Sequence, residues 1–145
     1  MDNNSEFNTV RRDTTESQPM SSVSPEREVY IANIGLHDYS GVYTWATQGE
    51  KGIRKVTSGD IDRKNPERLI ANIVDGLKDF QPQDYFVFSG SPIPFAIGLS
   101  YLFMVQDEVS VLYYLRSRNE YFCITYTREM FANARHLALD SPPTT

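Results

Sequence analysis

Residues 84–98 read DYFVFSGSPIPFAIG, and this junction between a strand and a helix decides most of the fold. Residues 85–88 are apolar at every position, which is typical of a central strand covered on both faces. Ser91 and Pro92 then suit a helix start, because serine caps a first turn and proline fits its first position. A strand-like run at 109–115 follows, so the segment predicts a right-handed βαβ unit with parallel strands.

Three strand-like runs precede this unit. They are rich in β-branched and aromatic residues and are separated by glycine-containing turns: 29–34, 42–47 and 53–57. Short turns between such runs predict an antiparallel meander. An amphipathic helix is expected over 66–80, where Asn65 can cap the first turn and apolar residues recur at helical spacing.

The chain after the βαβ unit predicts a hairpin and a last helix. The runs 109–115 and 121–126 are joined by a short polar turn, and a helix is expected over about 127–139. The predicted order is β-β-β-α-β-α-β-β-α, an α/β fold with a single mixed sheet. This order resembles that of ribonuclease-H-like domains and is also compatible with a Rossmann-like sheet. The helix over 93–105 is apolar nearly all round, so we expect it to be buried.

Composition limits the classes of function. The 145 residues suit one domain over 28–139, between polar tails at 1–27 and 140–145. The formal net charge of −5 argues against general nucleic-acid binding, which requires a basic surface. The single cysteine, Cys123, excludes an intrachain disulfide. Together with the lack of a signal peptide or membrane-length apolar segment, this predicts a cytoplasmic protein that has no membrane contact.

The common patterns of enzyme chemistry are missing. A two-metal nuclease needs carboxylates on neighbouring strands, whereas the first strand offers Asn33 and only Asp38 is well placed. Ser89 or Ser91 could join His37 and Asp38 in a hydrolytic triad, but the G-x-S-x-G pattern is absent. The sequence has neither a zinc pattern nor a phosphate-binding glycine motif. These observations favour a non-catalytic protein without metal or cofactor, and they leave an enzyme open.

One functional hypothesis is a small-ligand site where the strands end. Open α/β sheets bind ligands at the carboxyl ends of their parallel strands, and a helix amino terminus attracts anions. Loops 35–41 and 89–92 should meet at that edge and hold a small anionic or nucleotide-like ligand. The candidate residues are Asn33, His37, Asp38, Ser89, Gly90 and Ser91. The simpler interpretation is an ordinary turn, since Pro92 and Pro94 remove two N–H donors.

The leading hypothesis is a binding or regulatory module that contacts a protein partner or a second copy of itself. Tyrosine and arginine are enriched at interface hot spots, and the predicted hairpin carries both: Tyr113, Tyr114, Arg116, Arg118 and Tyr121. Strand alternation turns half of the hairpin's aromatic side chains outward, which is more than solubility requires. The last helix or a partner chain would cover them. Single-stranded nucleic acid could stack on such rings, but the negative net charge favours protein.

Overall fold

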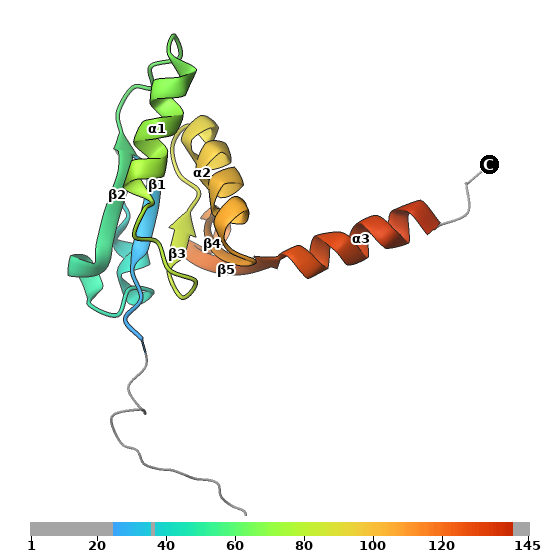
Figure 1. Cartoon of the computed structure of the whole chain (residues 1–145). Helices are drawn as coiled ribbons and strands as arrows, with labels where there is room; N and C mark the ends of the chain where they lie inside the picture. The colour runs from blue at the N-terminus through green and yellow to red at the C-terminus, as the bar shows by residue number, and fades with distance from the viewer. Residues whose placement is uncertain (1–24, 36, 141–145) are drawn as a thin grey trace, which may run out of the picture.

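A computed structural model describes residues 25–35 and 37–140 of the chain (Figure 1). The predicted tails lie outside the described residues, apart from 25–27 and Asp140. The regular elements follow the order β1 (Val29–Ile34), β2 (Ile53–Ser58), α1 (Pro66–Gly76), β3 (Tyr85–Val87), α2 (Pro92–Val105), β4 (Glu108–Leu115), β5 (Glu120–Thr127) and α3 (Arg128–Asp140). Three 3₁₀ turns span Ser40–Thr44, Gly49–Gly52 and Arg116–Arg118.

The five strands form a single mixed sheet in the order β2-β1-β3-β4-β5. Strands β2, β1, β3 and β4 are parallel to one another, and β5 is antiparallel to β4. The α/β class, the single mixed sheet, the β3-α2-β4 unit with parallel strands and the β4–β5 hairpin are therefore confirmed. The helix predicted over 66–80 is also present, although it ends at Gly76 and a turn leads on to Phe80.

The predicted antiparallel meander is wrong. Residues 42–47 form a 3₁₀ turn and bends instead of a strand, and β1 pairs with β2 in parallel. The reason lies in the spacing of the buried residues, since Tyr39, Val42 and Ala46 are separated by three and four positions. That spacing places them on one face of a helical turn, whereas a half-buried strand alternates at every second residue.

Both faces of the sheet are covered. Helices α1 and α2 pack on one face, where Leu77 and Leu102 meet Phe86 of β3. Gly98 brings α2 very close to the sheet, because a Cβ atom there would lie 2.6 Å from the ring of Phe86. The 39–46 segment covers the other face, with Val42 against the buried side of β1. This sheet with its covering segments is called the body below.

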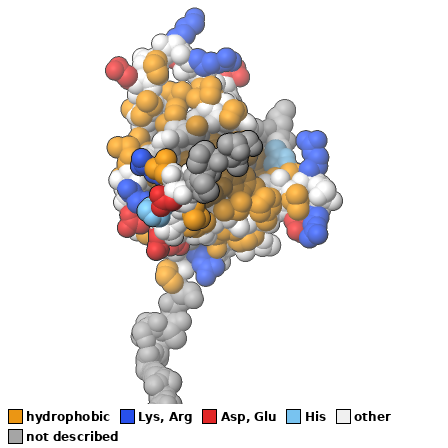
Figure 2. Space-filling view, turned by 90° about the vertical axis from the view of Figure 1, so that its right-hand side faces the viewer, with side chains coloured by type: hydrophobic (Ala, Val, Ile, Leu, Met, Phe, Trp, Pro, Cys, Tyr) orange, Lys and Arg blue, Asp and Glu red, His pale blue; other side chains and the backbone are white. Residues whose placement is uncertain are grey.

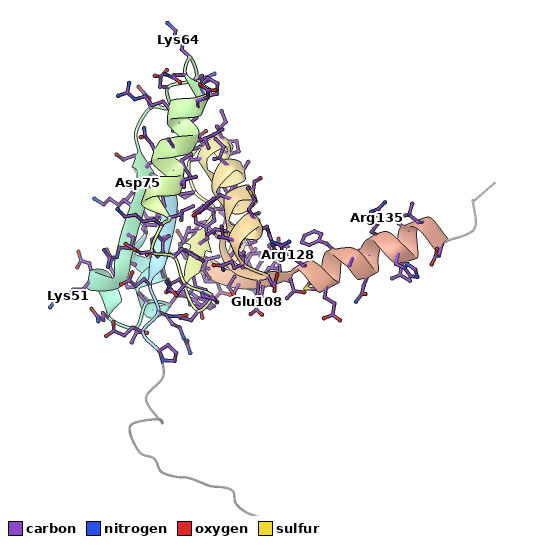
Figure 3. The ribbon with its side chains drawn as sticks, in the orientation of Figure 1. Lys51, Lys64, Asp75, Glu108, Arg128 and Arg135 are labelled. Atoms are coloured by element: carbon purple, nitrogen blue, oxygen red, sulfur yellow. The ribbon has the colours of Figure 1, made fainter. Side chains whose placement is uncertain are left out.

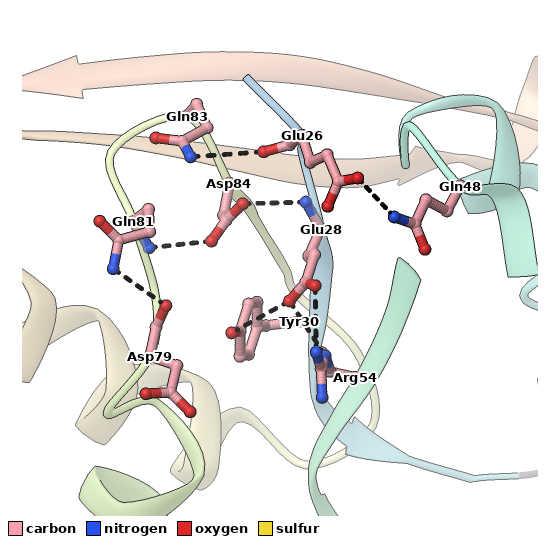
Figure 4. A network of polar contacts seen from close by, with 9 residues as sticks. All are labelled: Glu26, Glu28, Tyr30, Gln48, Arg54, Asp79, Gln81, Gln83 and Asp84. Carbon is pink, nitrogen blue, oxygen red and sulfur yellow. Dashed lines mark hydrogen bonds and ion pairs between the residues drawn. The ribbon is translucent and has the colours of Figure 1, made fainter. Parts of the chain in front are cut away.

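A polar network connects the chain at the amino-terminal ends of the parallel strands (Figure 4). The buried Asp84 carboxylate accepts hydrogen bonds of 2.8 Å from the backbone N–H groups of Glu28 and Gln81. Arg54 of β2 forms a bidentate ion pair with Glu28. Burial raises the pKa of Asp84 above its usual value, and the two N–H donors partly oppose that shift. The network joins β1 to β2 and to the start of β3.

Helix α2 was expected to be buried, but the structure buries only one side of it. Its buried residues, Pro94, Gly98 and Leu102, are four positions apart and form one stripe against the sheet. Met104 is 78% exposed, and Ile93 and Val105 are also exposed. The outer surface of the most apolar helix in the chain therefore faces solvent.

Helix α3 projects away from the body (Figure 1). None of its residues is buried. Its first turn reaches the aromatic hairpin through Phe131, whose ring stacks on Tyr126. The expected cover of the hairpin by the last helix is therefore limited to that end. Figure 2 views the molecule from the side on which α3 projects and shows hydrophobic side chains over much of that face.

Candidate functional site

The sheet has a crevice where the connections of two adjacent parallel strands separate. The chain leaving β1 passes over one face through the 39–46 segment, whereas the chain leaving β3 enters α2 on the other face. Such a switch point opens a gap beyond the carboxyl ends of the strands, and α/β sheets characteristically bind ligands there. The position of the candidate site thus follows from the topology alone.

A pocket of about 600 Å³ lies at this edge and is called the strand-end pocket. It is lined by His37, Phe88, Ser89, Gly90, Tyr113, Tyr114, Leu115, Arg116, Tyr121 and Phe122. The structure therefore brings together residues from both sequence hypotheses, the ligand loops and the tyrosine hairpin. The sequence analysis treated these two groups as separate surfaces, although its predicted βαβ unit and hairpin already placed them in one sheet.

Four predicted residues do not line this pocket, and three of them have structural roles nearby. Asn33 is buried, where its side-chain amide donates to the carbonyl of Gly59 and accepts from the hydroxyl of Thr57. Ser91 caps α2 by accepting from the N–H of Ile93. The Asp38 carboxylate accepts from the N–H of Ser40, and this hydrogen bond lowers the pKa of Asp38. The fourth, Arg118, lies in the hairpin turn beyond the pocket wall.

His37 sits among aromatic rings. Its Nε2 lies 3.0 Å from the hydroxyl of Tyr121, and its ring contacts Tyr39 and Tyr114 edge-on at centroid distances of 4.9 and 4.8 Å. Burial is the main cause that raises the pKa of Tyr121 to about 12. The phenol is therefore neutral at physiological pH, and it holds the imidazole as part of the pocket wall.

The serine of the loop is held by β1 and the segment that follows it. The Ser89 hydroxyl hydrogen-bonds to the hydroxyl of Tyr39 and donates to the carbonyl of Asn33. Gly90 adopts a positive φ of 63°, and a Cβ atom there would lie 2.8 Å from the Asn33 carbonyl oxygen. Ser89, His37 and Asp38 thus have different partners, and no hydrogen bond joins them among the described residues. The three side chains are therefore not linked in the way that a catalytic triad requires.

The chemistry of the pocket suits a flat aromatic group better than a bare phosphate. Its walls are mainly the rings of Phe88, Tyr113, Tyr114 and Phe122, and Arg116 is the one cationic residue among those lining it. The first turn of α2 offers few donors, because Pro92 and Pro94 lack N–H groups and Ser91 occupies the N–H of Ile93. A ligand would stack on the rings and place an acidic group near Arg116.

The described part of the chain has neither a cluster of metal ligands nor a membrane-spanning helix. Within 25–35 and 37–140, no group of three or more His, Cys, Asp and Glu side chains is placed to hold a metal ion. Over the same residues, no helix has both the length and the apolar character needed to cross a bilayer.

A second candidate surface lies on the helices. An apolar groove of about 480 Å³, called the α1–α2 groove, is lined by Ile70, Val74, Ala96, Ile97, Ser100, Tyr101 and Met104. Helix α3 presents an apolar stripe, called the α3 stripe, made of Met130, Phe131, Ala134 and Leu137. Three of these stripe residues are half exposed or more: Met130 at 50%, Phe131 at 55% and Leu137 at 70%.

The base of α3 is fixed to the body. Arg128 forms a 3.0 Å ion pair with Asp107 and donates to the carbonyl of Phe103. Phe131 contacts the rings of Phe103 and Tyr126 at centroid distances of 5.9 and 6.0 Å. Figure 3 shows Arg128 at this base and Arg135 farther out along the helix. The direction of α3 is therefore set by its first turn, while the rest extends into solvent.

The fold and these surfaces define a small α/β protein with a strand-end pocket and a projecting carboxyl-terminal helix. Residues 49–128 match the model of the family described as Phage Pam3 gp32-like protein. This match covers more than half of the chain, so the protein belongs to that family. The matched region includes the α1–α2 groove and the hairpin side of the pocket. Neither the curated proteins nor the solved structures include a match.

Proposed function

We propose that this protein is a non-catalytic binding module that acts through protein–protein contact, chiefly self-association, with α3 as its main contact element. The observation that carries the proposal is that α3 leaves the body without a buried residue. An isolated helix of 13 residues is marginally stable in water and normally gains its stability from packing. Arg128 and Phe131 fix the first turn to the body, and we propose that a second molecule covers the exposed apolar side chains farther along the helix.

The distribution of exposed apolar side chains supports this proposal. Eight of the eleven exposed large hydrophobic residues in the described chain lie on α1, α2 and α3. Burying one such side chain is worth about 1.5–3 kcal/mol, and clustered exposure of this kind marks interaction surfaces. The separate structural hydrogen bonds of His37, Ser89 and Asp38 support the non-catalytic part. The unpaired thiol of Cys123 fits a cytoplasmic, reducing environment.

Light scattering on the full chain over a range of concentrations tests the proposal. We expect a dimer or higher assembly whose dissociation constant rises at least tenfold in Leu137→Glu, because this change places a charge in the α3 stripe. Asn133→Glu is the matched control, since it adds the same charge to the same helix on its polar face. A wild-type chain that stays monomeric throughout would refute self-association.

The strand-end pocket supports a second candidate function, which is binding of a small aromatic anion or a nucleotide-like molecule. The observation in its favour is the position of the pocket at the carboxyl ends of β3 and β4, beside the switch point between β1 and β3. The single guanidinium of Arg116 at an otherwise aromatic wall gives the ligand its expected charge. Such a ligand could regulate assembly, because Tyr113 and Phe122 of the pocket belong to the same hairpin that leads into α3.

A further inference from the structure

We infer that the α3 stripe of one copy occupies the α1–α2 groove of a second copy, and that the exchange is reciprocal. This inference rests on the proposed self-association and adds the partner and the place where it binds. The groove and the stripe are each present on every chain, and the described structure leaves both open to solvent.

The shape of the groove allows one helix to pack in it. On the α2 side, Ala96 and Ser100 are small and lie one turn apart, which allows a second helix to come close. On the α1 side, Ile70 and Val74 are also one turn apart and form the opposite wall. The exposed Met104 closes one end. Every residue lining the groove is uncharged, so a charged or strongly polar segment would lose hydration there without compensation.

The α3 stripe matches the α1–α2 groove in length and shape. Met130 and Leu137 are seven residues apart, which corresponds to about 10 Å along a helix. Ala96 and Met104 on α2 are eight residues apart, or about 12 Å. Ala134 lies between Met130 and Leu137 along the stripe, so these two large side chains can flank the small ridge of α2. Phe131, the third large residue of the stripe, stays on the rings of Phe103 and Tyr126. The stripe, like the groove, contains no charge.

The same chain cannot bring its own stripe to its own groove. Strand β5 ends at Thr127 and α3 begins at Arg128, so no loop lies between them. The contacts of Arg128 and Phe131 then hold the first turn in its projecting direction. Figure 1 shows α3 extending from the side of the body on which α2 lies. A second copy placed along α3 therefore meets that helical side.

A reciprocal exchange explains more of the exposed surface than the alternatives do. Two-fold symmetry buries two stripes and two grooves in one assembly, twice the apolar surface that a one-way contact would bury. Pairing of α3 with the α3 of a second copy would leave the α1–α2 groove in water. Pairing between two β5 edges would leave both the groove and the stripe exposed.

Disulfide trapping between separately labelled full-length chains tests the inference. In a Cys123→Ser background, one preparation carries Ala134→Cys on α3, and a second carries Ser100→Cys or Ala96→Cys in the groove. The two preparations are mixed and oxidised, so that only an interchain bond can join them. We expect the mixed disulfide between α3 and the groove to exceed at least tenfold that formed with Lys55→Cys, an exposed control on β2.

The outcomes separate this inference from the proposed function. Mixed disulfides at the groove support it. Two results would refute binding in the α1–α2 groove while leaving self-association intact. One is a disulfide that forms only between two Ala134→Cys chains. The other is a dimer by light scattering that gives no disulfide with the groove cysteines. A monomer would overturn both. Finally, a Ser100→Cys thiol that resists maleimide in the monomeric Leu137→Glu chain would show that another segment of the same chain fills the groove, which also overturns the inference.

Discussion

The imidazole Nε2 of His37 lies 3.0 Å from the phenolic oxygen of Tyr121, so one hydrogen bond joins the loop after β1 to the start of β5. In the sheet, β3 and β4 lie between β1, which precedes that loop, and β5. The contact closes the strand-end pocket from the side of the 39–46 segment. It also links the amino-terminal part of the domain to the hairpin from which α3 extends.

Tyr121→Phe should lower the free energy of unfolding by about 1 kcal/mol, the usual net value of one hydrogen bond. The ring stays, so packing against Tyr114 and the 39–46 segment is preserved. Urea unfolding at neutral pH measures the change. Tyr114→Phe is the control, because its hydroxyl bonds to the exposed Asn119 and its loss should cost less. An equal loss in both variants would contradict a special role for the His37–Tyr121 bond.

The same tyrosine predicts how stability depends on alkaline pH. Burial raises the pKa of Tyr121 and of Tyr30 from 10.0 to about 12. The folded protein therefore holds these phenolic protons more tightly than the unfolded chain does, and stability falls as pH rises from about 10 to about 12. Urea unfolding at about pH 9 and about pH 11.5 should show this loss, and Tyr121→Phe should lose less over the same interval. Identical losses in the two proteins would refute the assignment to Tyr121.

Arg116 and Arg118 offer a matched test of the strand-end pocket. Both lie in the short turn between β4 and β5, but only Arg116 lines the pocket. We expect that an aromatic carboxylate or a nucleoside monophosphate that raises the Tm of the wild type also raises that of Arg118→Ala, but not that of Arg116→Ala. At a ligand concentration 100 times the Kd the stabilisation should reach about 2.7 kcal/mol. No Tm shift in the wild type with any probe of either class would remove the ligand hypothesis.

Asp84 should contribute strongly to stability although it lines neither candidate surface. Asp84→Ala leaves the N–H groups of Glu28 and Gln81 without their acceptor in a partly buried place, and it should cost about 2–3 kcal/mol in urea unfolding. Asp84→Asn should cost less, since the amide carbonyl still accepts one of the two bonds. A loss below 0.5 kcal/mol for Asp84→Ala, on the order of an ordinary surface substitution, would show that water replaces the carboxylate.

The features that the sequence predicted correctly depend on local patterns. The apolar run 85–88, the caps at Asn65 and Ser91 and the β4–β5 hairpin each specify their own element without reference to the rest of the chain. The 42–47 segment was mistaken for a strand because its residue types favour strands, while its buried positions follow a helical spacing. That error also gave β1 and β2 the wrong relative direction.

The candidate sites were less predictable because they depend on where the elements meet. His37 and Tyr114 share a pocket only because the strands that carry or precede them end at the same edge of the sheet. The amphipathic pattern of 128–140 shows that α3 has an apolar face, yet it does not show what covers that face. The direction of α3 follows from contacts of Arg128 and Phe131 that no periodicity reveals.

Folding of α3 should depend on protein concentration. Its first turn is held by Arg128 and Phe131, and Thr127 caps it by accepting from the N–H of Met130. The outer part gains its packing only from a second molecule under the proposed exchange, so its amides should exchange quickly in dilute protein and slowly in concentrated protein. Hydrogen–deuterium exchange read by peptide mass resolves these two parts.

In Leu137→Glu the outer amides should exchange quickly at every concentration, whereas in Asn133→Glu they should follow the wild type. Protection of the outer turns that is equally strong in dilute wild type and in Leu137→Glu would mean that α3 is stable alone, and the need for a partner would lose its physical basis.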